Sequence, residues 1–278
     1  MWTPVAGLTL LALNTANDVS LMTSSTDIGC WVVTDGKPGM ENQCLGLAEA
    51  LGFHIAVKRI RPRAPWRWLP PRLWLAPLAS LGPNSDPLRP PWPQLLIASG
   101  RMSVALSAEI RRRAAGKTFT VQIQSPGLSP NHFDLVVPPR HDWLRGDNVL
   151  PTRGALHRVT PERLRQEAAA FETDIASLPR PLVAVLIGGG NGVYRLGPTE
   201  ARGLGRKLVE LTETGAGLAV TLSRRTGGTN ERILRDALAG VPAVVWDGTG
   251  PNPYFGYLGL ADTILVTCDS VSMTSEAA

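Results

Sequence analysis

The stretch LVAVLIGGGNG, residues 182–192, decides the fold of this chain. Its six apolar residues predict a β-strand, and the glycines that follow predict a tight loop. The same order repeats downstream in helices and strands predicted at residues 199–214, 217–222, 229–238, 243–246 and 263–267. Strands that alternate with helices indicate a parallel sheet with helices on both faces. We therefore predict a Rossmann-like domain over residues 181–278.

The preceding part of the chain, residues 30–178, carries a similar alternation. Strands are predicted at residues 31–34, 54–60, 94–99, 118–124 and 133–137, and helices at residues 41–51, 103–115 and 161–177. Residues 149–159 are predicted to form a strand and a turn. The proline-rich residues 178–181 are the predicted linker between the two domains. The fold class is thus α/β, with two Rossmann-like domains whose mostly parallel sheets face a cleft.

Residues 1–29 are set apart as an uncertain N-terminal extension. Residues 7–13 resemble the apolar core of a short signal peptide, but no Lys or Arg precedes them, and a start at Met22 is the preferred alternative. The three cysteines lack metal-ligand spacing and favour a reducing compartment. No apolar run approaches the length of a membrane span. We expect a cytoplasmic protein, or one held peripherally on the inner face of the membrane.

Positive charge is concentrated in one part of the chain. The 278 residues carry a net charge of +5, and residues 58–117 hold twelve Lys or Arg against Asp86 and Glu109. This stretch is either a solvated basic face or a surface that attracts anionic lipid head groups or acidic substrates. Nucleic acid is not expected as a partner, because no helix-turn-helix, zinc-finger or RNP-type pattern is present. The Pro-, Trp- and Arg-rich residues 61–93 form either a surface insertion or a membrane-facing flap, and their prolines oppose a long helix.

Ligands of open parallel sheets bind beyond the carboxyl ends of the strands, and four loops at such positions carry suitable groups. The first loop, residues 35–43, offers Lys37 as a cation and Asp35 or Glu41 as a base. Its glycines let the backbone approach a ligand, but Pro38 follows the lysine where a Walker A loop needs Ser or Thr. The alternative is a plain glycine turn with a capping aspartate.

The other three loops belong to the second domain. Residues 188–192 suit a phosphate or a sugar, but not NAD, because Val193 stands where a dinucleotide fingerprint needs its last glycine. Residues 223–228 place Arg225 and a second arginine beside hydroxyls, which suits a diphosphate. A structural turn in the first case and a solvated turn in the second are the alternatives. Residues 269–276 combine hydroxyls with a helix start, where free N–H groups and the helix dipole favour phosphate.

The last of these loops ends the chain. A carboxylate just inside the following helix, Glu276, is suited to accept hydrogen bonds from a ribose diol. The chain stops two residues later, at Ala278, so we expect this helix not to form and the second domain to be incomplete.

Five motifs in order along the chain resemble one known family. They are TDGKPGMENQ (residues 34–43), SGR (99–101), IGGGNG (187–192), SRRT (223–226) and VTCDSVSMTSEA (266–277). With them the chain resembles the mitochondrial-fission "elongated mitochondria" family, whose bacterial relatives look like glycosyltransferases of the GT-B architecture. The first and last motifs are the most specific.

The resemblance implies a nucleotide-sugar donor held mainly by the second domain. Gly189 and Gly190 would face the donor phosphates, and Arg225 would pair with the diphosphate. Ser272 and Ser275 would donate to phosphate, with Glu276 on the ribose hydroxyls. Attack by an acceptor hydroxyl needs a base from the first domain.

The catalytic candidates are Asp35 and Glu41, since Met40, at the centre of that loop, cannot ionise. The candidate substrate-binding residues are Gly36, Lys37, Gly39, Asn42, Gly100, Arg101, Gly189, Gly190, Asn191, Arg225, Thr226, Asn252, Ser270, Ser272, Ser275 and Glu276.

The function that the resemblance implies is that of a metal-independent glycosyltransferase. Its substrates would be a nucleoside-diphosphate sugar and a carbohydrate or lipid-linked acceptor of the cell envelope, with no separate cofactor. An anionic membrane surface is a further expected partner. The alternatives are a nucleotide-sugar epimerase of the same fold and a non-catalytic membrane-associated scaffold, and fold analogy alone does not choose among them.

Overall fold

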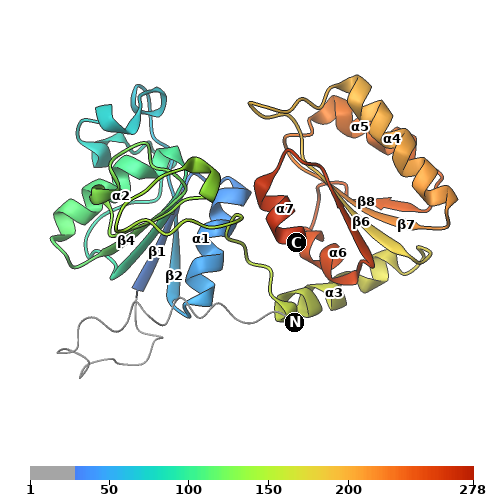
Figure 1. Cartoon of the computed structure of the whole chain (residues 1–278), viewed down its shortest axis with the longest axis horizontal. Coiled ribbons are helices and arrows are strands. Elements are labelled where there is room, and N and C mark those ends of the chain that lie inside the picture. Colours follow the sequence, from blue (N-terminus) through green and yellow to red (C-terminus); the bar gives the residue numbers. More distant parts are fainter. Residues whose placement is uncertain (1–28) are drawn as a thin grey trace.

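Residues 29–278 form two α/β domains that lie side by side in the computed structural model (Figure 1). The predictions made for residues 1–28, including the signal-peptide-like stretch and the start at Met22, lie outside the described residues. Among the residues described, no helix combines the length and the apolar character needed to cross a bilayer.

The first domain is built on a five-stranded sheet in which every strand pair is parallel. The strand order is β2-β1-β3-β4-β5. The strands are β1 (Gly29–Thr34), β2 (His54–Arg59), β3 (Leu95–Ser99), β4 (Phe119–Ile123) and β5 (Leu135–Val137). All five were predicted, and the parallel arrangement confirms the α/β class.

The strand predicted within residues 149–159 is wrong. This stretch touches the edge strand β5 and its extension only through isolated bridges at Val149 and Thr152. Prolines at 138, 139 and 151 lie in the paired region, and a proline has no N–H to donate to a ladder. The stretch therefore follows the sheet edge without joining it.

Helices cover both faces of the first sheet. On one face α1 (Pro38–Ala50) buries Cys44 and Ala48 against β1 and its neighbours. On the other face α2 (Arg101–Ala114) packs together with the Pro/Trp-rich stretch that follows β2. That stretch contains the single turns η4 (Trp66–Trp68), η5 (Pro71–Leu73) and η6 (Pro77–Ser80), which confirms that its prolines prevent a long helix. Two further turns, η7 (Pro130–His132) and η8 (Arg140–Asp142), flank β5.

The second domain has a four-stranded parallel sheet of order β8-β7-β6-β9. Its strands are β6 (Leu182–Ile187), β7 (Gly217–Leu222), β8 (Ala243–Val245) and β9 (Thr263–Val266). Helices α4 (Pro198–Glu213) and α5 (Gly228–Leu238) pack on one face. Because β6 lies inside the sheet, all six of its residues are buried, which explains its uninterrupted apolar sequence.

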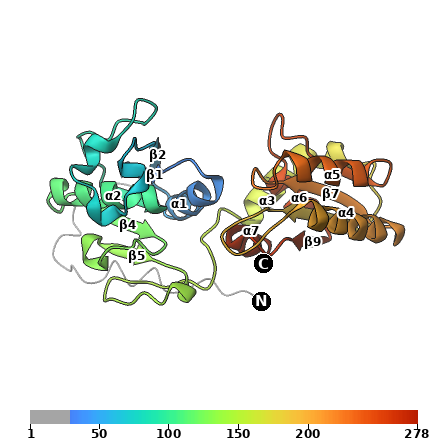
Figure 2. The same ribbon diagram turned by 90° about the horizontal axis from the view of Figure 1, so that it is seen from above.

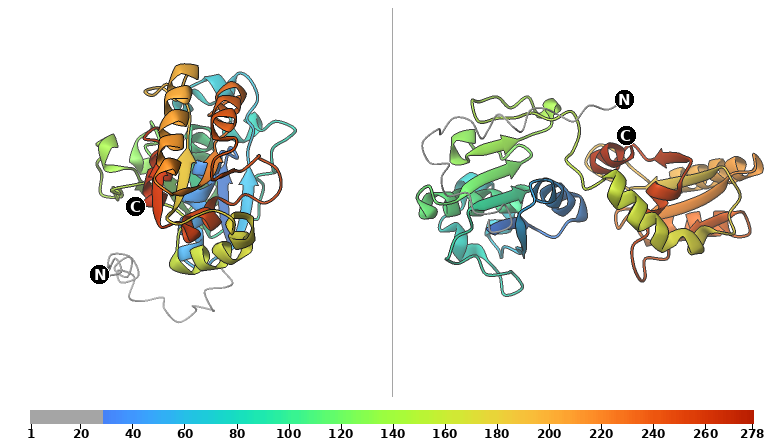
Figure 3. Two further views of the ribbon diagram at one scale, coloured as in Figure 1. Left: turned by 90° about the vertical axis from the view of Figure 1, so that its right-hand side faces the viewer. Right: turned by 90° about the horizontal axis from the view of Figure 1, so that it is seen from below.

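Helices α3 (Pro161–Ile175) and α6 (Tyr254–Leu260) pack on the opposite face. Figure 3 shows α3 running along the second domain, although it precedes the predicted linker. Two glycines of α6 make the close packing possible: a Cβ on Gly256 would lie 2.6 Å from the Phe171 ring, and one on Gly259 would lie 2.5 Å from the Leu164 carbonyl oxygen.

Two helices near the C-terminus were not predicted. No helix was predicted between the strands at residues 243–246 and 263–267, yet α6 begins at Tyr254. The expectation that no helix forms after the terminal turn is also wrong, because α7 (Val271–Ala277) is present. The Ser270 hydroxyl accepts a hydrogen bond from the Met273 amide at 3.4 Å, so the turn supplies its own N-cap.

Helix α7 lies where the second domain meets the first (Figure 1). Gln43 of α1 donates to the Ser272 hydroxyl at 3.4 Å. The Ala155 amide, on the extended stretch that leads to α3 (Figure 2), donates to the Ser275 hydroxyl at 2.9 Å. Arg158 of the same stretch forms an ion pair with Glu49 of α1. The domain junction is thus formed by α1, α7 and residues 153–160.

Candidate functional site

A cavity of about 400 Å³ lies between the two domains. From the first domain it is lined by residues that follow β4 and β5, among them Ser125, His141 and Asp142. From the second domain it is lined by Arg225, which follows β7, and by residues 269–272, which follow β9. The cavity therefore sits at the carboxyl ends of strands from both sheets, where ligands of open α/β folds bind.

Asp269 is the most strongly bound carboxylate of this cavity. Its Oδ2 accepts from the Gly189 amide at 2.9 Å and pairs with Arg225 Nη2 at 2.9 Å, and its Oδ1 accepts from the Thr267 hydroxyl at 2.6 Å. The side chain is only 7% exposed. Gly188 must lack a side chain here, because a Cβ would overlap the carboxylate.

This arrangement changes the role of two predicted phosphate ligands. The Gly189 amide and the Arg225 guanidinium do converge on one point, as a diphosphate site requires. The point is occupied by the protein's own Asp269 carboxylate. Arg225 is still 40% exposed and lines the cavity, and its guanidinium has N–H groups beyond the one paired with Asp269.

The other predicted residues of these loops hold the backbone together. Asn191 donates to the Asp269 carbonyl oxygen at 2.8 Å and accepts from the amides of Val193 and Tyr194. The buried Thr226 hydroxyl donates to the Gly188 carbonyl oxygen. A Cβ on Gly189 would overlap the backbone of Arg225, whereas Gly190 has only Tyr194 within 4 Å. The two loops are therefore in direct backbone contact.

Glu276 is buried at the domain junction, with 8% of its surface exposed. Its Oε2 accepts a hydrogen bond from the Tyr254 hydroxyl at 2.6 Å. Burial raises the pKa of Glu276, and hydrogen bonds from Tyr254 and Asn42 partly oppose this effect. Burial and the nearby Glu276 carboxylate raise the pKa of the Tyr254 phenol as well. The residue predicted to hold a ribose diol thus contacts α6 of its own domain and α1 of the other domain.

The two serines predicted to bind phosphate lie at the junction. Ser275 accepts from the Ala155 amide and donates to the Val271 carbonyl oxygen at 2.8 Å. Ser272 accepts from Gln43 and also lines the cavity, together with the capping residue Ser270.

Both predicted bases form ion pairs outside the cavity. Asp35 pairs with Lys37 at 2.6 Å. Glu41 forms two hydrogen bonds with Arg59, at 2.7 and 3.0 Å. Neither carboxylate belongs to the cavity lining.

The ionisable pair that does line the cavity from the first domain is His141 and Asp142. His141 Nε2 lies 3.7 Å from Asp142 Oδ1, and Asp142 Oδ2 accepts from the Ser125 amide at 3.3 Å. Sequence reasoning missed this pair, because His141 lacks metal spacing and follows a short strand. The one signal was an adjacent His and Asp directly after β5.

The remaining candidates have structural surroundings of their own. Gly36 and Gly100 have positive φ angles of 77° and 87°, which favour glycine. A Cβ on Gly39 would lie 3.2 Å from the Ser272 hydroxyl. Arg101 donates to the carbonyl oxygens of two residues in the Pro/Trp-rich stretch, at 2.6 and 3.0 Å. Asn252 accepts from the Tyr254 amide at the start of α6.

Comparison with known proteins gives the family. The profile of the family described as Mitochondrial fission ELM1 matches residues 38–278. This chain belongs to the mitochondrial fission ELM1 family. The "Mitochondrial fission protein ELM1" of Arabidopsis thaliana is 32% identical to it, and the match covers 88% of this chain and 75% of the relative. An uncharacterized protein of Rickettsia prowazekii is 25% identical, and the match covers 67% of this chain and 62% of that protein.

Solved structures support the architecture of this ELM1-family chain. A UDP-GlcNAc 2-epimerase from Methanocaldococcus jannaschii superposes with a TM-score of 0.52 at 11% identity, over 90% of this chain and 81% of the other. One from Neisseria meningitidis, bound to UDP-GlcNAc, superposes with a TM-score of 0.51 at 11% identity, over 88% of this chain and 79% of the other. At this identity the likeness concerns the fold, and it confirms the predicted GT-B-like arrangement of two Rossmann-like domains.

Proposed function

We propose that this ELM1-family chain binds a nucleoside-diphosphate sugar between its domains and transfers the sugar to an acceptor hydroxyl. The acceptor is a carbohydrate or a lipid-linked molecule. The observation that carries the proposal is the convergence of Arg225 and the Gly189 amide on one anionic group at the wall of the cavity. Backbone amides and a guanidinium are the groups that proteins use for diphosphates.

The second domain would hold the donor. Arg225 lines the cavity, and its guanidinium has N–H groups in addition to the one that pairs with Asp269. A diphosphate competes with the Asp269 carboxylate for these groups, because both are anions that accept from the same donors. Asp269 would therefore weaken donor binding while it keeps the loops after β6, β7 and β9 in place.

The first domain would supply the base. The imidazole of His141 lines the cavity and has Asp142 beside it, which suits a histidine that accepts a proton. We assign this role to His141 in place of Asp35 and Glu41, whose carboxylates are engaged by Lys37 and Arg59.

The chemistry balances with these groups alone. The acceptor oxygen forms a bond to the anomeric carbon while the bond from that carbon to the diphosphate oxygen breaks. The acceptor proton moves to His141, and the electron pair leaves with the nucleoside diphosphate, whose developing charge faces Arg225. The donor sugar is a substrate in this scheme, and no separate cofactor is invoked.

A thermal-shift titration with UDP, GDP, ADP and CMP tests donor binding. One nucleotide at one hundred times its Kd should stabilise the protein by about 2.7 kcal/mol. Arg225→Gln should abolish the shift, and Arg224→Gln should retain it, since Arg224 is an exposed arginine at the preceding position and does not line the cavity. Asp269→Asn should bind the nucleotide roughly fivefold more tightly, because removal of a competing charge is worth about 1 kcal/mol.

Two results would contradict donor binding at this site. One is the absence of a shift with every nucleotide, and the other is an equal loss in the Arg224 and Arg225 variants. For the base, His141→Gln should lower kcat of sugar transfer with little change in KM, whereas an equal fall in nucleotide affinity would assign His141 to binding.

A nucleotide-sugar epimerase is the second candidate, favoured by the fold shared with two UDP-GlcNAc 2-epimerases. Incubation of the protein with a donor sugar and no acceptor separates the two reactions. An epimerase converts the sugar while the nucleotide stays attached, and a transferase does not. A non-catalytic scaffold, suggested by the name of the Arabidopsis relative, would show neither nucleotide binding nor turnover.

A further inference from the structure

The Pro/Trp-rich stretch, residues 61–92, plays no part in the proposed function. It belongs to the first domain and lies away from the second domain in Figures 1 and 2. Its position between β2 and β3 is where a parallel sheet ordinarily has a crossover helix. Three single turns and extended backbone replace that helix.

This stretch is firmly held against the domain. Trp66 Nε1 donates to the Leu75 carbonyl oxygen at 2.9 Å, and Trp74 Nε1 donates to the Leu69 carbonyl oxygen at 3.1 Å. Arg101 of α2 donates to the same Leu69 carbonyl oxygen and to the Arg67 carbonyl oxygen. The outward-pointing side chains are therefore carried by a backbone that hydrogen bonds hold in place.

Three large apolar side chains point outward from it. Trp68 is 68% exposed, Leu73 is 53% exposed and Leu75 is 83% exposed. Single exposed apolar residues are ordinary, but three within eight residues form a patch that favours contact with an apolar phase. The other apolar members, such as Trp74, pack into the core of the first domain.

Positive charge surrounds this patch. Residues 61–85 contain four arginines and no acidic residue. The Arg67 guanidinium stacks over the Trp68 ring at 4.7 Å. Within the described residues, the side chains of Arg61 and Arg72 have neither a hydrogen bond nor an ion pair. The patch therefore combines exposed apolar groups with cations that are free to bind anions.

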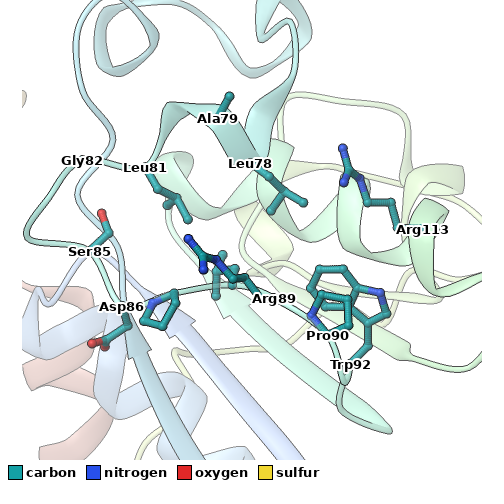
Figure 4. Close-up of a pocket in the computed structure, with 12 residues that line it drawn as sticks. Leu78, Ala79, Leu81, Gly82, Ser85, Asp86, Arg89, Pro90, Trp92 and Arg113 are labelled. Atoms are coloured by element: carbon teal, nitrogen blue, oxygen red, sulfur yellow. The ribbon is translucent and has the colours of Figure 1, made fainter.

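A groove of about 660 Å³ borders the same stretch (Figure 4). Its walls are largely apolar and include Leu78, Leu81 and Trp92. Figure 4 shows the Arg89 side chain extending between these walls, and Arg113 at one side. Arg113 is already paired with Glu109 at 2.7 Å. Asp86 also lines the groove, and its carboxylate accepts from the Arg59 amide at 2.7 Å. The groove thus combines apolar walls with the Arg89 cation.

We propose that residues 61–92 dock this protein on an anionic phospholipid bilayer. Trp68, Leu73 and Leu75 would enter the interfacial region, where tryptophan is favoured, and Arg67 and Arg72 would bind lipid phosphates. A bilayer fits better than a protein partner, because the segment that carries the patch, residues 61–85, has four arginines and no acidic residue. The one carboxylate of the stretch, Asp86, accepts from the Arg59 backbone amide at 2.7 Å. Docking here leaves the cavity between the domains uncovered, since the stretch contributes no residue to its lining.

Flotation of the full chain with vesicles tests the proposal. Vesicles of phosphatidylcholine with 30% phosphatidylglycerol should bind the protein, and vesicles of pure phosphatidylcholine should bind it at least tenfold more weakly. Trp68→Ala/Leu75→Ala should lower binding to the anionic vesicles at least tenfold at every salt concentration. Arg67→Gln/Arg72→Gln should lower it at low salt and flatten its salt dependence.

Matched variants outside the stretch give the controls. Trp143→Ala removes an indole that is 79% exposed, and Arg202→Gln/Arg206→Gln removes two exposed arginines of α4. Both should bind vesicles as the parent protein does, with unchanged melting temperatures in all variants. Equal losses in the controls, equal binding to neutral vesicles, or no vesicle binding would overturn the proposal. The proposal would also be overturned if the parent protein self-associated and Trp68→Ala/Leu75→Ala did not. That result would assign the patch to a contact between copies of the protein.

Discussion

Glu276 shows how a single side chain links burial, charge and the junction between the domains. Its carboxylate is enclosed by Tyr254 of α6 and by Asn42 of α1. A buried carboxylate that keeps its charge loses hydration, and two hydrogen bonds replace only part of it. Burial of Glu276 therefore costs more free energy when the carboxyl group is ionised than when it is protonated. As a result, the stability of the protein depends on pH.

The sign of this dependence follows from the raised pKa of Glu276. A carboxyl group with a higher pKa in the folded state stabilises the fold at pH values below its unfolded-state pKa. That stability is lost as the pH rises through the folded-state pKa. Glu276→Gln removes the titrating proton but keeps the shape and an acceptor oxygen. We therefore expect the melting temperature of Glu276→Gln, relative to that of the parent protein, to increase as the pH rises from 4 to 8.

Melting curves measured at each pH provide the check, with Glu210→Gln as the control because Glu210 is an exposed residue of α4. A difference between parent and Glu276→Gln that does not change with pH would show that Glu276 is not a titrating residue in this range.

At the scale of elements, close packing depends on glycines of the helices. Gly46 of α1 faces the stretch that connects the domains, and a Cβ there would lie 2.6 Å from the carbonyl carbon of His157. The neighbour is backbone, so it does not rotate away as a side chain does. Gly203 of α4, in contrast, has nothing within 4 Å of its Cβ position.

These two glycines give opposite predictions for the same substitution. Gly46→Ala should destabilise the protein by about 1–3 kcal/mol through overpacking. Gly203→Ala should stabilise it by about 1 kcal/mol, because alanine restricts the unfolded chain and favours a helix. Urea unfolding measures both changes. Gly46→Ala should also speed tryptic cleavage at Arg153 and Arg158, and an unchanged cleavage rate would argue against packing of α1 on this stretch.

Two elements of the second domain show when a sequence pattern is sufficient to predict secondary structure. Strand β6 was predicted with its correct bounds because all of its residues are buried and apolar. Helix α6 was missed because its sequence YFGYLGL contains two glycines, which lower helix propensity but let the helix approach α3. In α6 the glycines lower the local helix propensity, whereas packing against α3 favours the helix. Only the local propensity can be read from the sequence.

The site was predicted less well than the fold for a related reason. Arg225 and Gly189 were both predicted at the donor diphosphate, and both contact Asp269 in the structure because they follow strands at one sheet edge. That Asp269 occupies the point between them depends on the distance between two loops, which no local pattern records. His141 was passed over because it lacks metal spacing, and because the residues that face it across the cavity, Arg225 and Asp269, belong to the other domain.

At the scale of the whole molecule, the described residues form separate cores. The clusters of buried apolar residues on the first sheet share no member with those on the second. The domains meet through hydrogen bonds and through ion pairs of Glu49 with Arg158 and Arg163 at the junction. Domains joined by polar contacts of this kind unfold with limited cooperativity.

We expect two transitions in scanning calorimetry. Gly205→Val should lower only one of them, by roughly 5 °C, because a Cβ on Gly205 of α4 would already lie 2.8 Å from Ala237 of α5 in the second domain. A single transition, with equal calorimetric and van't Hoff enthalpies for the whole chain, would show that the junction couples the domains fully.

Because α1 lies close to α7, an engineered disulfide between these helices could link the two domains. A Cβ at Gly39 would lie 3.7 Å from Cβ of Ser272 on the other domain, which is close to the separation found in disulfides. A cysteine pair at these positions would lock the domains when oxidised and release them when reduced. Assays of the proposed sugar transfer under the two conditions would then report whether that reaction requires the domains to move apart.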